Sequence, residues 1–241
     1  MAPRPVNLAD FSPPAGLRIW IPAPHPDDFD AIGVTMRFYR RNGAELFVDV
    51  ISGSASGVED GFCHNDLDET KCRQREEEQR ESLRYFGLPL DRLCFLRFPE
   101  DEDGHLRDGL EEEERLAHRL DQVSPHLVFL PHQNDTNTGH QRTARLLKQI
   151  TARLKGSFTA FLIRDPKTRQ SRLDAYMAFD EEAAQWKAAL LRCHLSQQSR
   201  NLKRRGYGFD ERILVLNQKV AVELGCPAPY AEAYELADWF H

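Results

Sequence analysis

The chain has 241 residues, of which 41% are hydrophobic and 29% are charged, a balance that is ordinary for a soluble enzyme with a well-packed core. Its formal net charge of −6 argues against a general binder of nucleic acids or anionic membranes. Five cysteines without a closely spaced pair argue against a disulfide framework and favour a reducing compartment, so we predict a cytoplasmic protein.

The first 16 residues carry prolines at positions 3, 5, 13 and 14 and lack the apolar core of a signal peptide. We expect residues 1–16 to be an irregular N-terminal lead-in. Nowhere does the chain contain a run of about 18 apolar residues, so no membrane span is expected.

From Leu17 onward, short apolar runs alternate with segments of helical length. The runs predict strands at 17–23, 45–52, 92–98, 126–132 and 157–163. The other segments predict helices at 30–43, 71–87, 110–123, 139–154 and 180–198. Strands separated by helices predict βαβ units, and we expect an α/β, Rossmann-like three-layer fold with a mainly parallel sheet. No repeat or long linker divides the chain, so residues 1–241 are expected to form a single domain.

Polar loops follow four of the predicted strands at the point where each strand ends. HPDD (25–28) follows the first strand, SGSASG (52–57) the second, PEDEDG (99–104) the third and PHQNDTNTGH (131–140) the fourth. In open α/β sheets, ligands bind outside the carboxyl ends of the strands. We therefore expect a functional site where these four loops meet.

A metal site is the strongest interpretation of these loops. His25 and Asp28 lie three residues apart in a turn that Pro26 restrains, and His140, where a helix begins, is the best candidate for a third ligand. Two histidines and one carboxylate, with a position left open for water, are typical of catalytic Zn²⁺ and compatible with Fe²⁺. Asp27 would face that water as a general base. Burial and neighbouring carboxylates would have to raise its pKa from about 3.9, whereas the metal's charge would lower it.

Each of these residues also has a purely structural interpretation. His-Pro-Asp-Asp alone could be a turn that supplies an aspartate N-cap to the next helix. His140 alone could be an ordinary residue of a first helical turn, and His132 is read as a structural histidine. Their common position at one predicted edge of the sheet favours the metal site.

Five segments also carry a family resemblance, in the order PHPDDFD, RQREEEQRESLRYFG, PHQNDTNTGH, WKAALLRCHLSQQ and PYAEAYEL. They resemble motifs of the PIG-L/LmbE-like N-acetylglucosaminyl de-N-acetylases: His-Pro-Asp-Asp, an Arg-x-x-Glu helix, Asp-x-His-Pro-Asp-His, Lys…His-x-Ser-Gln and Tyr-Ala-Glu-Ala-Phe. The matching positions include Arg75, Glu78, His140, Lys187 and His194. The resemblance spans residues 17–236, and five motifs in order are more specific than the first motif alone.

The resemblance implies a zinc-dependent de-N-acetylase in which His25, Asp28 and His140 hold one Zn²⁺ per chain. It makes Asp27 the base that takes a proton from the metal-activated water as this attacks the acetamide carbonyl. Asp27 would then return the proton to the leaving amine, while the metal and a polar donor hold the oxyanion.

Two positions depart from the family pattern. The family often has a histidine, thought to stabilise the oxyanion, three residues before the last ligand. Here that position is Asn137, an amide that can donate a hydrogen bond but carries no positive charge. The acid that normally precedes the last ligand is replaced by Gly139, so Asp135 is the candidate acceptor that orients His140.

Further residues are candidates for substrate binding or for support of the site. Asp30 is expected to support the turn or the start of the helix that follows. Arg75 is a candidate anchor for a substrate carboxylate, phosphate or hydroxyl, and an ion pair with Glu78 on the helix surface is an equal alternative. His132 and His194 are candidates to compensate for the missing family histidine.

We therefore expect a metal-dependent hydrolase that removes an acetyl group from a GlcNAc-type amino sugar, a glycoconjugate or a related small metabolite. One alternative is a degenerate member that binds a sugar without hydrolysing it, which Asn137 and Gly139 favour. Another is a hydrolase of a non-sugar amide. No nucleic-acid partner is expected. Homo-oligomerisation, the exact substrate and the choice of zinc or iron stay open.

Overall fold

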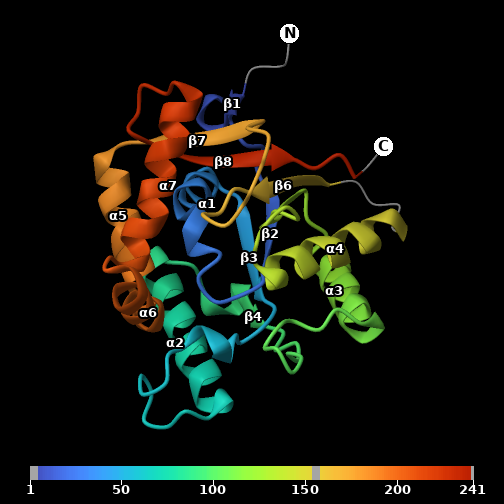
Figure 1. Ribbon diagram of the computed structural model, residues 1–241. Helices are drawn as coiled ribbons and strands as arrows, with labels where there is room; N and C mark the ends of the chain where they lie inside the picture. Colours follow the sequence, from blue (N-terminus) through green and yellow to red (C-terminus); the bar gives the residue numbers. More distant parts are fainter. Residues whose placement is uncertain (1–4, 154–157, 240–241) are drawn as a thin grey trace.

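Eight strands form one sheet within residues 5–153 and 158–239, the part of the chain that the computed structural model describes (Figure 1). The order across the sheet is β1-β7-β8-β6-β5-β2-β3-β4. Only β8 runs antiparallel to its neighbours, β6 and β7; the other paired strands are parallel. The strands are β1 Val6–Asn7, β2 Arg18–Ala23, β3 Glu45–Val50, β4 Leu93–Phe95, β5 Leu127–Pro131, β6 Thr159–Ile163, β7 Ala175–Phe179 and β8 Tyr230–Leu236.

Helices cover both faces of this sheet, which confirms the predicted α/β class and its mainly parallel sheet. In Figure 1, α3 and α4 lie together on one side, and α1, α5 and α7 lie on the other. The helices are α1 Gly33–Arg41, α2 Asp68–Phe86, α3 Leu110–Val123, α4 Thr138–Arg153, α5 Glu181–Arg192, α6 Leu195–Arg205 and α7 Phe209–Leu224. None of them is long and apolar enough to cross a membrane.

The side chains of the central strand β2 point alternately to the two faces of the sheet, and each face is covered by an apolar core cluster. Ile19 and Ile21 belong to the core cluster that also contains residues of α1, α2 and α5. Trp20 points the other way and joins the cluster built by α3 and α4. Because successive side chains of a strand point to opposite faces, an all-apolar strand is buried from both sides, and each such side chain contributes about 1.5–3 kcal/mol.

The strand order places a topological switch at β2. From β2 the chain moves outward through β3 and β4 on one side, then returns to β5 and β6 on the other. The loops after β2, β3 and β5 therefore leave the same edge of the sheet and diverge, which opens a crevice at their carboxyl ends. This crevice is where the sequence predicts the site.

The two ends of the chain contain structure that the sequence patterns did not predict. Within the expected irregular lead-in, β1 pairs in parallel with β7, with Val6 opposite Ala175. Pro5 directly precedes β1, a position compatible with an edge strand because no ladder hydrogen bond is needed from it. Strand β7, helix α7 and strand β8 were not assigned, although they complete the sheet and its cover.

Two predicted helices begin or end differently. The helix expected at 30–43 starts with a 3-10 turn at Asp30–Ile32 before α1 begins at Gly33. The helix expected at 180–198 is two helices, because His194 lies between them with φ −85° and ψ 71°. Helix α6 then starts where Ser196 donates its backbone N–H to Glu78. Residues 154 and 157, at the ends of a predicted helix and a predicted strand, lie outside the described residues.

Candidate metal centre

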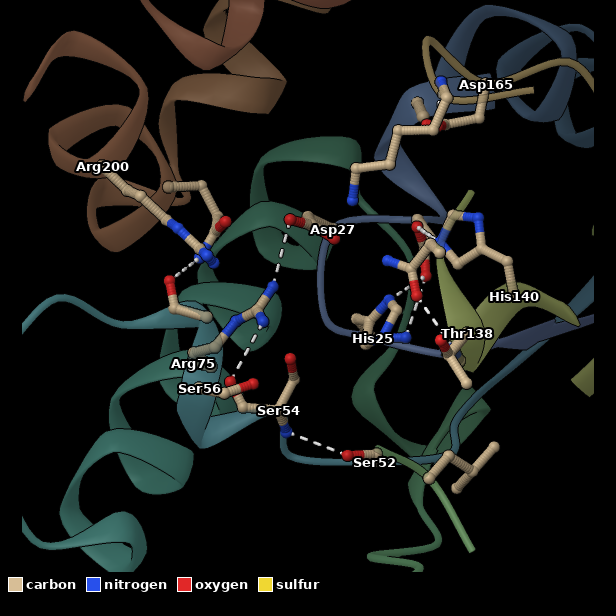
Figure 2. Close-up of a pocket in the computed structure, with 18 of the residues that line it drawn as sticks. His25, Asp27, Ser52, Ser54, Ser56, Arg75, Thr138, His140, Asp165 and Arg200 are labelled. Atoms are coloured by element: carbon tan, nitrogen blue, oxygen red, sulfur yellow. Dashed lines mark hydrogen bonds and ion pairs between the residues drawn. The ribbon is translucent and has the colours of Figure 1, made fainter. Parts of the chain in front are cut away.

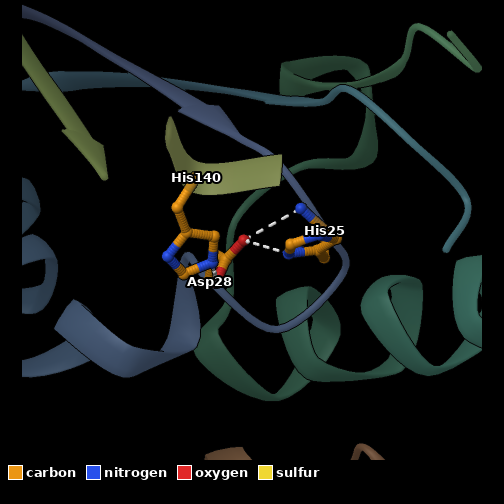
Figure 3. A group of neighbouring side chains, drawn as sticks. All are labelled: His25, Asp28 and His140. Atoms are coloured by element: carbon orange, nitrogen blue, oxygen red, sulfur yellow. Dashed lines mark hydrogen bonds and ion pairs between the residues drawn. The ribbon is translucent and has the colours of Figure 1, made fainter. Parts of the chain in front are cut away.

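The turn after β2 brings His25 and Asp28 together. Asp28 Oδ2 accepts a hydrogen bond from the backbone N–H of His25 at 2.8 Å and lies 3.2 Å from the ring Nδ1 of the same residue. Figure 3 shows these two side chains facing His140. Burial lowers the pKa of His25 to about 4, so its imidazole is neutral and free to act as a ligand.

His140 completes the group from the first turn of α4, more than a hundred residues away in sequence. Its Nε2 lies 3.3 Å from Asp28 Oδ1, and its Nδ1 lies 3.2 Å from Asp135 Oδ2. Ligand atoms of His25, Asp28 and His140 all lie within 4.8 Å of one another. Although burial opposes it, the two imidazoles hold the pKa of Asp28 well below its usual range, so this carboxyl is ionised. The donor set fits Zn²⁺ or Fe²⁺.

A second group of potential ligands shares His140. Ligand atoms of Asp135, His140 and Asp165 also lie within 4.8 Å of one another. Nδ1 of His140 faces Asp135, however, whereas Nε2 faces Asp28. Asp135 is therefore placed to accept a hydrogen bond from Nδ1–H, which fixes the tautomer that leaves Nε2 available to a metal.

Asp27 lies next to this group in an unusual backbone conformation. Its φ of +108° is in the region that residues with a side chain rarely adopt. Its backbone N–H donates to Gln79 Oε1 at 2.9 Å, and its carboxylate lies 3.0 Å from the Arg75 guanidinium (Figure 2). Burial raises the pKa of Asp27 to about 6, and the charge of Arg75 opposes this rise.

The inward face of α2 supplies these partners. Arg75, Glu78, Gln79 and Ser82 are all buried, at spacings of three and four residues along the helix. Arg75 donates to the carbonyl oxygen of Pro26 as well as to Asp27. Glu78 accepts from the backbone and hydroxyl of Ser196. Arg75 pairs with Asp27, and the alternative ion pair between Arg75 and Glu78 is not formed among the described residues. Gln79 could have been found from the sequence by its spacing of four residues from Arg75, which places both on the same face of the helix.

Two of the predicted supporting residues lie behind Asp27. Asp30 and His194 are both fully buried, and His194 Nε2 lies 2.7 Å from Asp30 Oδ2. The same carboxylate oxygen accepts hydrogen bonds from Gln79 and Ser82. Asp30 thus joins the turn after β2 to α2 through Gln79 and Ser82, and His194 contacts the same carboxylate.

A pocket of about 330 Å³ opens over the candidate ligands His25, Asp28 and His140. His25, Asp27, Asp28, Arg75, Asn137 and His140 line it, whereas Asp30, Asp135, His132 and His194 do not. His132 binds Glu235 through Nε2 at 3.2 Å and accepts the N–H of Asn134, which is the structural role favoured above. His132 and His194 are thus not placed to contact a substrate in this pocket, and neither compensates directly for the missing family histidine.

The two departures from the family pattern have local explanations. Asn137 Oδ1 accepts the backbone N–H of Gly139 at the start of α4, which leaves its side-chain N–H₂ as the group that can donate. A Cβ at position 139 would lie 2.7 Å from Nε2 of His25. Gly139 is therefore what allows the His25 ring to lie against α4.

Several lining residues were not found from the sequence. They come from the loop after β3, from the loop after β6 and from the C-terminal helices: Ser52, Ser54, Ser56, Lys167, Arg200 and Arg212. The sequence predicted that strand-end loops meet at the site, but it did not indicate which of their residues face a substrate. Polar loop residues lack the periodic spacing that reveals which side of a helix or strand is buried. Figure 2 shows Arg200 and Arg75 on one wall and His25 and His140 on the other, with Ser52 and Ser54 below.

Comparison with known proteins adds a family and a fold. The sequence model described as PIG-L: GlcNAc-PI de-N-acetylase matches residues 21–151. N,N'-diacetylchitobiose deacetylase from Pyrococcus horikoshii has a TM-score of 0.74 at 18% identity, over 92% of this chain and 84% of that one. The A40926 pseudoaglycone deacetylase Dbv21 has a TM-score of 0.72 at 16% identity, over 95% and 100% of the two chains.

A structure of a different enzyme is also similar. GalB, the 4-carboxy-2-hydroxymuconate hydratase from Pseudomonas putida KT2440, has a TM-score of 0.69 at 17% identity, over 92% of this chain and 96% of that one. At such identities the likeness concerns the fold, which hosts more than one reaction. Among curated protein sequences, none matches this chain. The residues of the site must therefore carry the functional argument.

Proposed function

Because the chain belongs to the PIG-L family of GlcNAc-PI de-N-acetylases, we propose that it removes the acetyl group from an N-acetylated amino sugar or a related small metabolite. The observation that carries this proposal is the position of Asp27 beside the group of His25, Asp28 and His140, in one pocket. The names of two similar structures, N,N'-diacetylchitobiose deacetylase and A40926 pseudoaglycone deacetylase, support deacetylation as the reaction.

His25, Asp28 and His140 would hold one divalent ion per chain, Zn²⁺ or Fe²⁺. Their donor set, with Asp135 behind His140, is the feature that supports this assignment. When bound, such an ion polarises a carbonyl group and lowers the pKa of water to about 7.

Asp27 holds and moves the proton. With a pKa of about 6, its carboxylate is ionised at neutral pH and basic enough to take a proton from the water that attacks the amide carbon. As the new C–O bond forms, Asp27 becomes protonated. It then passes this proton to the amide nitrogen as the C–N bond breaks, which releases acetate and the free amine. Arg75 keeps the carboxylate oriented at 3.0 Å, and the Asn137 side-chain N–H₂ is the donor proposed for the oxyanion.

The alternative of a sugar-binding member without activity loses one of its two supports. Gly139 is explained by the approach of the His25 ring and is compatible with a complete ligand set. Asn137 remains a neutral donor in place of a histidine, which predicts weaker oxyanion stabilisation rather than its loss. A hydrolase of a non-sugar amide would use the same residues, so only the substrate distinguishes it.

The proposal is tested by metal content and amine release. Protein purified without added metal should contain about one Zn²⁺ or Fe²⁺ per chain by elemental analysis, and should release amine from an N-acetylated sugar. Asp27→Asn should lower kcat by about 10²–10⁴-fold with metal content unchanged. A protein that stays metal-free after addition of either ion would contradict the proposal. Sugar binding without amine release would favour the degenerate alternative.

A further inference from the structure

The pocket is lined by cationic side chains that the proposed reaction does not use. The lining contains Arg75, Lys167, Arg200 and Arg212 together with four carboxylates, those of Asp27, Asp28, Glu100 and Asp165. Arg75 is buried and bound to Asp27 and to the Pro26 carbonyl, so the expected role of Arg75 as the main substrate anchor is not supported by its contacts.

Arg200, on α6, is only partly neutralised. Its Nε lies 3.5 Å from Glu59, and this one carboxylate also pairs with Lys203 and Arg204. Burial lowers the pKa of Arg200, and the neighbouring positive charge of Arg204 adds to this effect. A second anion would stabilise a guanidinium in such surroundings, because its N–H groups can donate hydrogen bonds to two oxygen atoms at once.

Arg212, in the first turn of α7, has no counter-ion within the described residues. Its side chain makes none of the hydrogen bonds or ion pairs found there, although it is partly buried. Of the two acids directly before it in sequence, Glu211 is exposed and Asp210 is paired with Arg192 at 2.7 Å. A cation in the first turn also opposes the helix dipole, so a bound anion would offset both unfavourable terms.

Lys167 adds a third positive charge from the loop between β6 and β7. Its backbone N–H binds Asp165 Oδ1, but its ammonium lies within 4.0 Å of no carboxylate of the described chain. The three cations therefore come from three different segments, and each faces the pocket with its charge incompletely paired. Surface lysines and arginines are usually explained by solvation. Here Arg212 and Lys167 have no counter-ion among the described residues, and Arg200 shares its carboxylate with two other cations. Their convergence on a single cavity indicates a ligand.

We propose that the substrate carries a carboxylate or phosphate in addition to its N-acetyl group, and that Arg200 and Arg212, assisted by Lys167, bind this anion. The inference rests on the proposed deacetylation. It restricts the substrate class to acidic N-acetylated sugars or similarly sized acidic amides. The guanidinium groups would fix the far end of the molecule while its amide lies at Asp27.

Matched substrates test this assignment on the metal-loaded protein. Amine release is compared for N-acetylglucosamine, N-acetylglucosamine 6-phosphate, N-acetylglucosamine 1-phosphate and N-acetylmuramic acid, whose lactyl group is a carboxylate. We expect at least one anionic substrate to exceed N-acetylglucosamine by roughly tenfold or more in kcat/KM. The phosphate and carboxylate compounds distinguish the two kinds of anion.

Arginine variants with matched controls assign the preference to the pocket. Arg200→Gln and Arg212→Gln should each lower kcat/KM for the anionic substrates by about tenfold. They should lower kcat/KM for N-acetylglucosamine by less, so most of the anionic preference is lost. Arg205→Gln on α6 and Lys219→Gln on α7 remove the same charge from exposed positions outside the pocket, and should leave the preference unchanged. A preference that survives both pocket variants would overturn the assignment.

A binding measurement separates this inference from the proposed reaction. Titration calorimetry with glucosamine 6-phosphate and glucosamine, on metal-loaded protein, needs no turnover. Tighter binding of the phosphate compound, lost in Arg212→Gln, supports the anion site even if no amine is released from any substrate. Amine release without any anionic preference, together with equal binding of the two amines, contradicts the anion site and leaves the deacetylase proposal intact.

Discussion

The strained turn at Asp27 is held by α2. A φ of +108° costs a residue with a side chain on the order of 1–3 kcal/mol, so surrounding contacts must maintain it. Gln79 accepts the Asp27 N–H and donates to Asp30, while Arg75 binds the carbonyl before Asp27 and its carboxylate. These contacts aim the carboxylate of Asp27 at the pocket.

Gln79→Leu should release this turn. We expect kcat of amine release to fall by about 10–100-fold with metal content unchanged, because the carboxylate of Asp27 moves from its productive position. The control is Gln74→Leu on the same helix. Among the described residues, the side chain of Gln74 bonds to Glu78 and not to the Asp27 turn. Unchanged kcat in a folded Gln79→Leu protein would show that Asp27 is positioned without it.

Asp135 should determine how tightly the metal is bound. Asp135→Asn should weaken metal affinity by about 10–100-fold, because His140 loses the carboxylate that orients its ring. Competition with a chromophoric chelator measures this change. Asp165→Asn is the informative comparison, since Asp165 belongs only to the second ligand group. If Asp165→Asn releases the metal while Asp28→Asn keeps it, the ion occupies that second group instead.

Among the elements, α1 depends on a carboxylate from the far end of the chain. Glu232 on β8 accepts the backbone N–H groups of Val34 and Thr35 at 3.0 and 2.8 Å, so it caps the helix that follows the metal motif. Lys187 on α5 is fully buried and lies 2.7 Å from the same carboxylate. The late motifs of the sequence thus support the first one.

Glu232→Gln should destabilise the protein by about 3–5 kcal/mol, because it leaves the buried Lys187 charge with only the neutral acceptors Ala31 and Asn217 among its hydrogen-bond partners. Denaturant unfolding measures this difference. Glu235→Gln on the same strand is a matched control that should cost about 1 kcal/mol or less, since Glu235 is partly exposed. Lys187→Met in addition to Glu232→Gln should recover part of the loss; no recovery would mean that capping of α1 dominates.

Helix α2 is tied to the loop after β4 by Glu76. This carboxylate lies 2.6 Å from Arg97 Nε and 2.9 Å from Arg80, and its side chain is only 6% exposed. Burial alone would raise its pKa, but the two arginines hold the pKa of Glu76 below the usual 4.5. Its contribution to stability is therefore fully present above about pH 4.5 and is lost as the pH falls through the lower folded-state pKa.

Glu76→Gln should cost about 1 kcal/mol at pH 7. The difference between the variant and the parent protein should shrink steadily below pH 4.5, because the parent's carboxyl then becomes protonated as well. Unfolding curves at pH 7, 5 and 3.5 measure this convergence. A difference that stays constant over this range would mean that the ion pair does not supply the stability.

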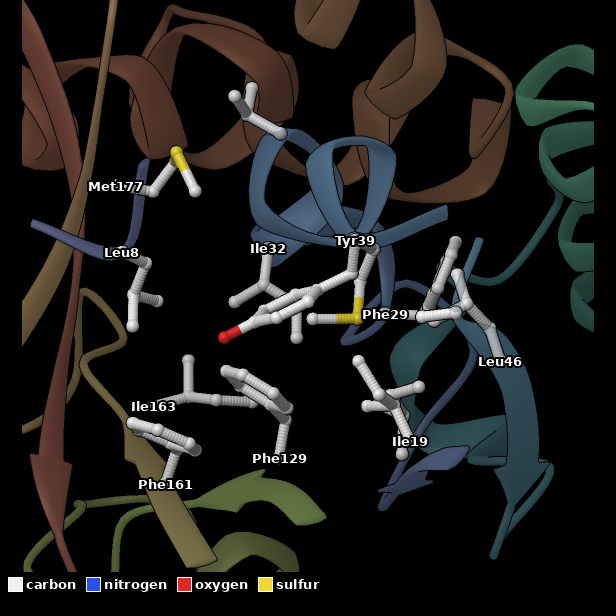
Figure 4. Close-up of a cluster of buried hydrophobic side chains, with 14 of the residues drawn as sticks. Leu8, Ile19, Phe29, Ile32, Tyr39, Leu46, Phe129, Phe161, Ile163 and Met177 are labelled. Carbon is white, nitrogen blue, oxygen red and sulfur yellow. The ribbon is translucent and has the colours of Figure 1, made fainter. Parts of the chain in front are cut away.

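At the scale of the whole molecule, the site is built on top of the larger apolar core. Figure 4 shows Ile19, Tyr39 and Phe129 within this core, which joins β2 and β5 to α1. Tyr39 and Phe129 pack edge to face with ring centroids 6.0 Å apart. Strand β2 leads to His25 and Asp28, and strand β5 leads to His140. Packing in this core therefore holds the candidate ligands together from below.

Metal removal should lower the thermal stability of the whole molecule. A ligand present at about 1,000 times its Kd stabilises the folded state by about 4 kcal/mol, which corresponds to a Tm change on the order of 10 °C for a chain of this size. Differential scanning calorimetry with and without a chelator measures it. Asp28→Asn is the control, because its Tm should not respond to chelator. Equal Tm values for the parent protein in both conditions would contradict a stabilising metal at this site.

Local patterns predicted most of the α/β framework. The five strands β2 to β6 and the helices between them follow from apolar runs and from helix ends such as Gly87, where φ is +83°. The patterns missed β1, β7, α7 and β8. Two-residue β1 is too short to show a period, and α7 and β8 have their apolar positions set by packing against each other.

For the site, the ligand set and Asp27 were proposed from residue types and family motifs, and they lie together in the pocket. The exposure of each side chain and the direction in which it points could not be predicted from residue types and motifs. His132 and His194 look like site residues in the sequence, but one is bound to Glu235 and the other to Asp30. Which way a side chain points depends on neighbours that are distant in sequence.

Local patterns along the chain were enough to predict the alternation of strands and helices. They were also enough to place His25, Asp28 and His140 at the carboxyl ends of the strands. Hydrophobic periodicity and strand-end loops are local properties, so they can be read along the chain. The contact between Arg75 and Asp27 could not be predicted in this way, nor could the convergence of Arg200, Arg212 and Lys167 on one pocket. Charge pairing depends on distance in space, and residues from α2, α6 and α7 meet only after the sheet has brought their helices together.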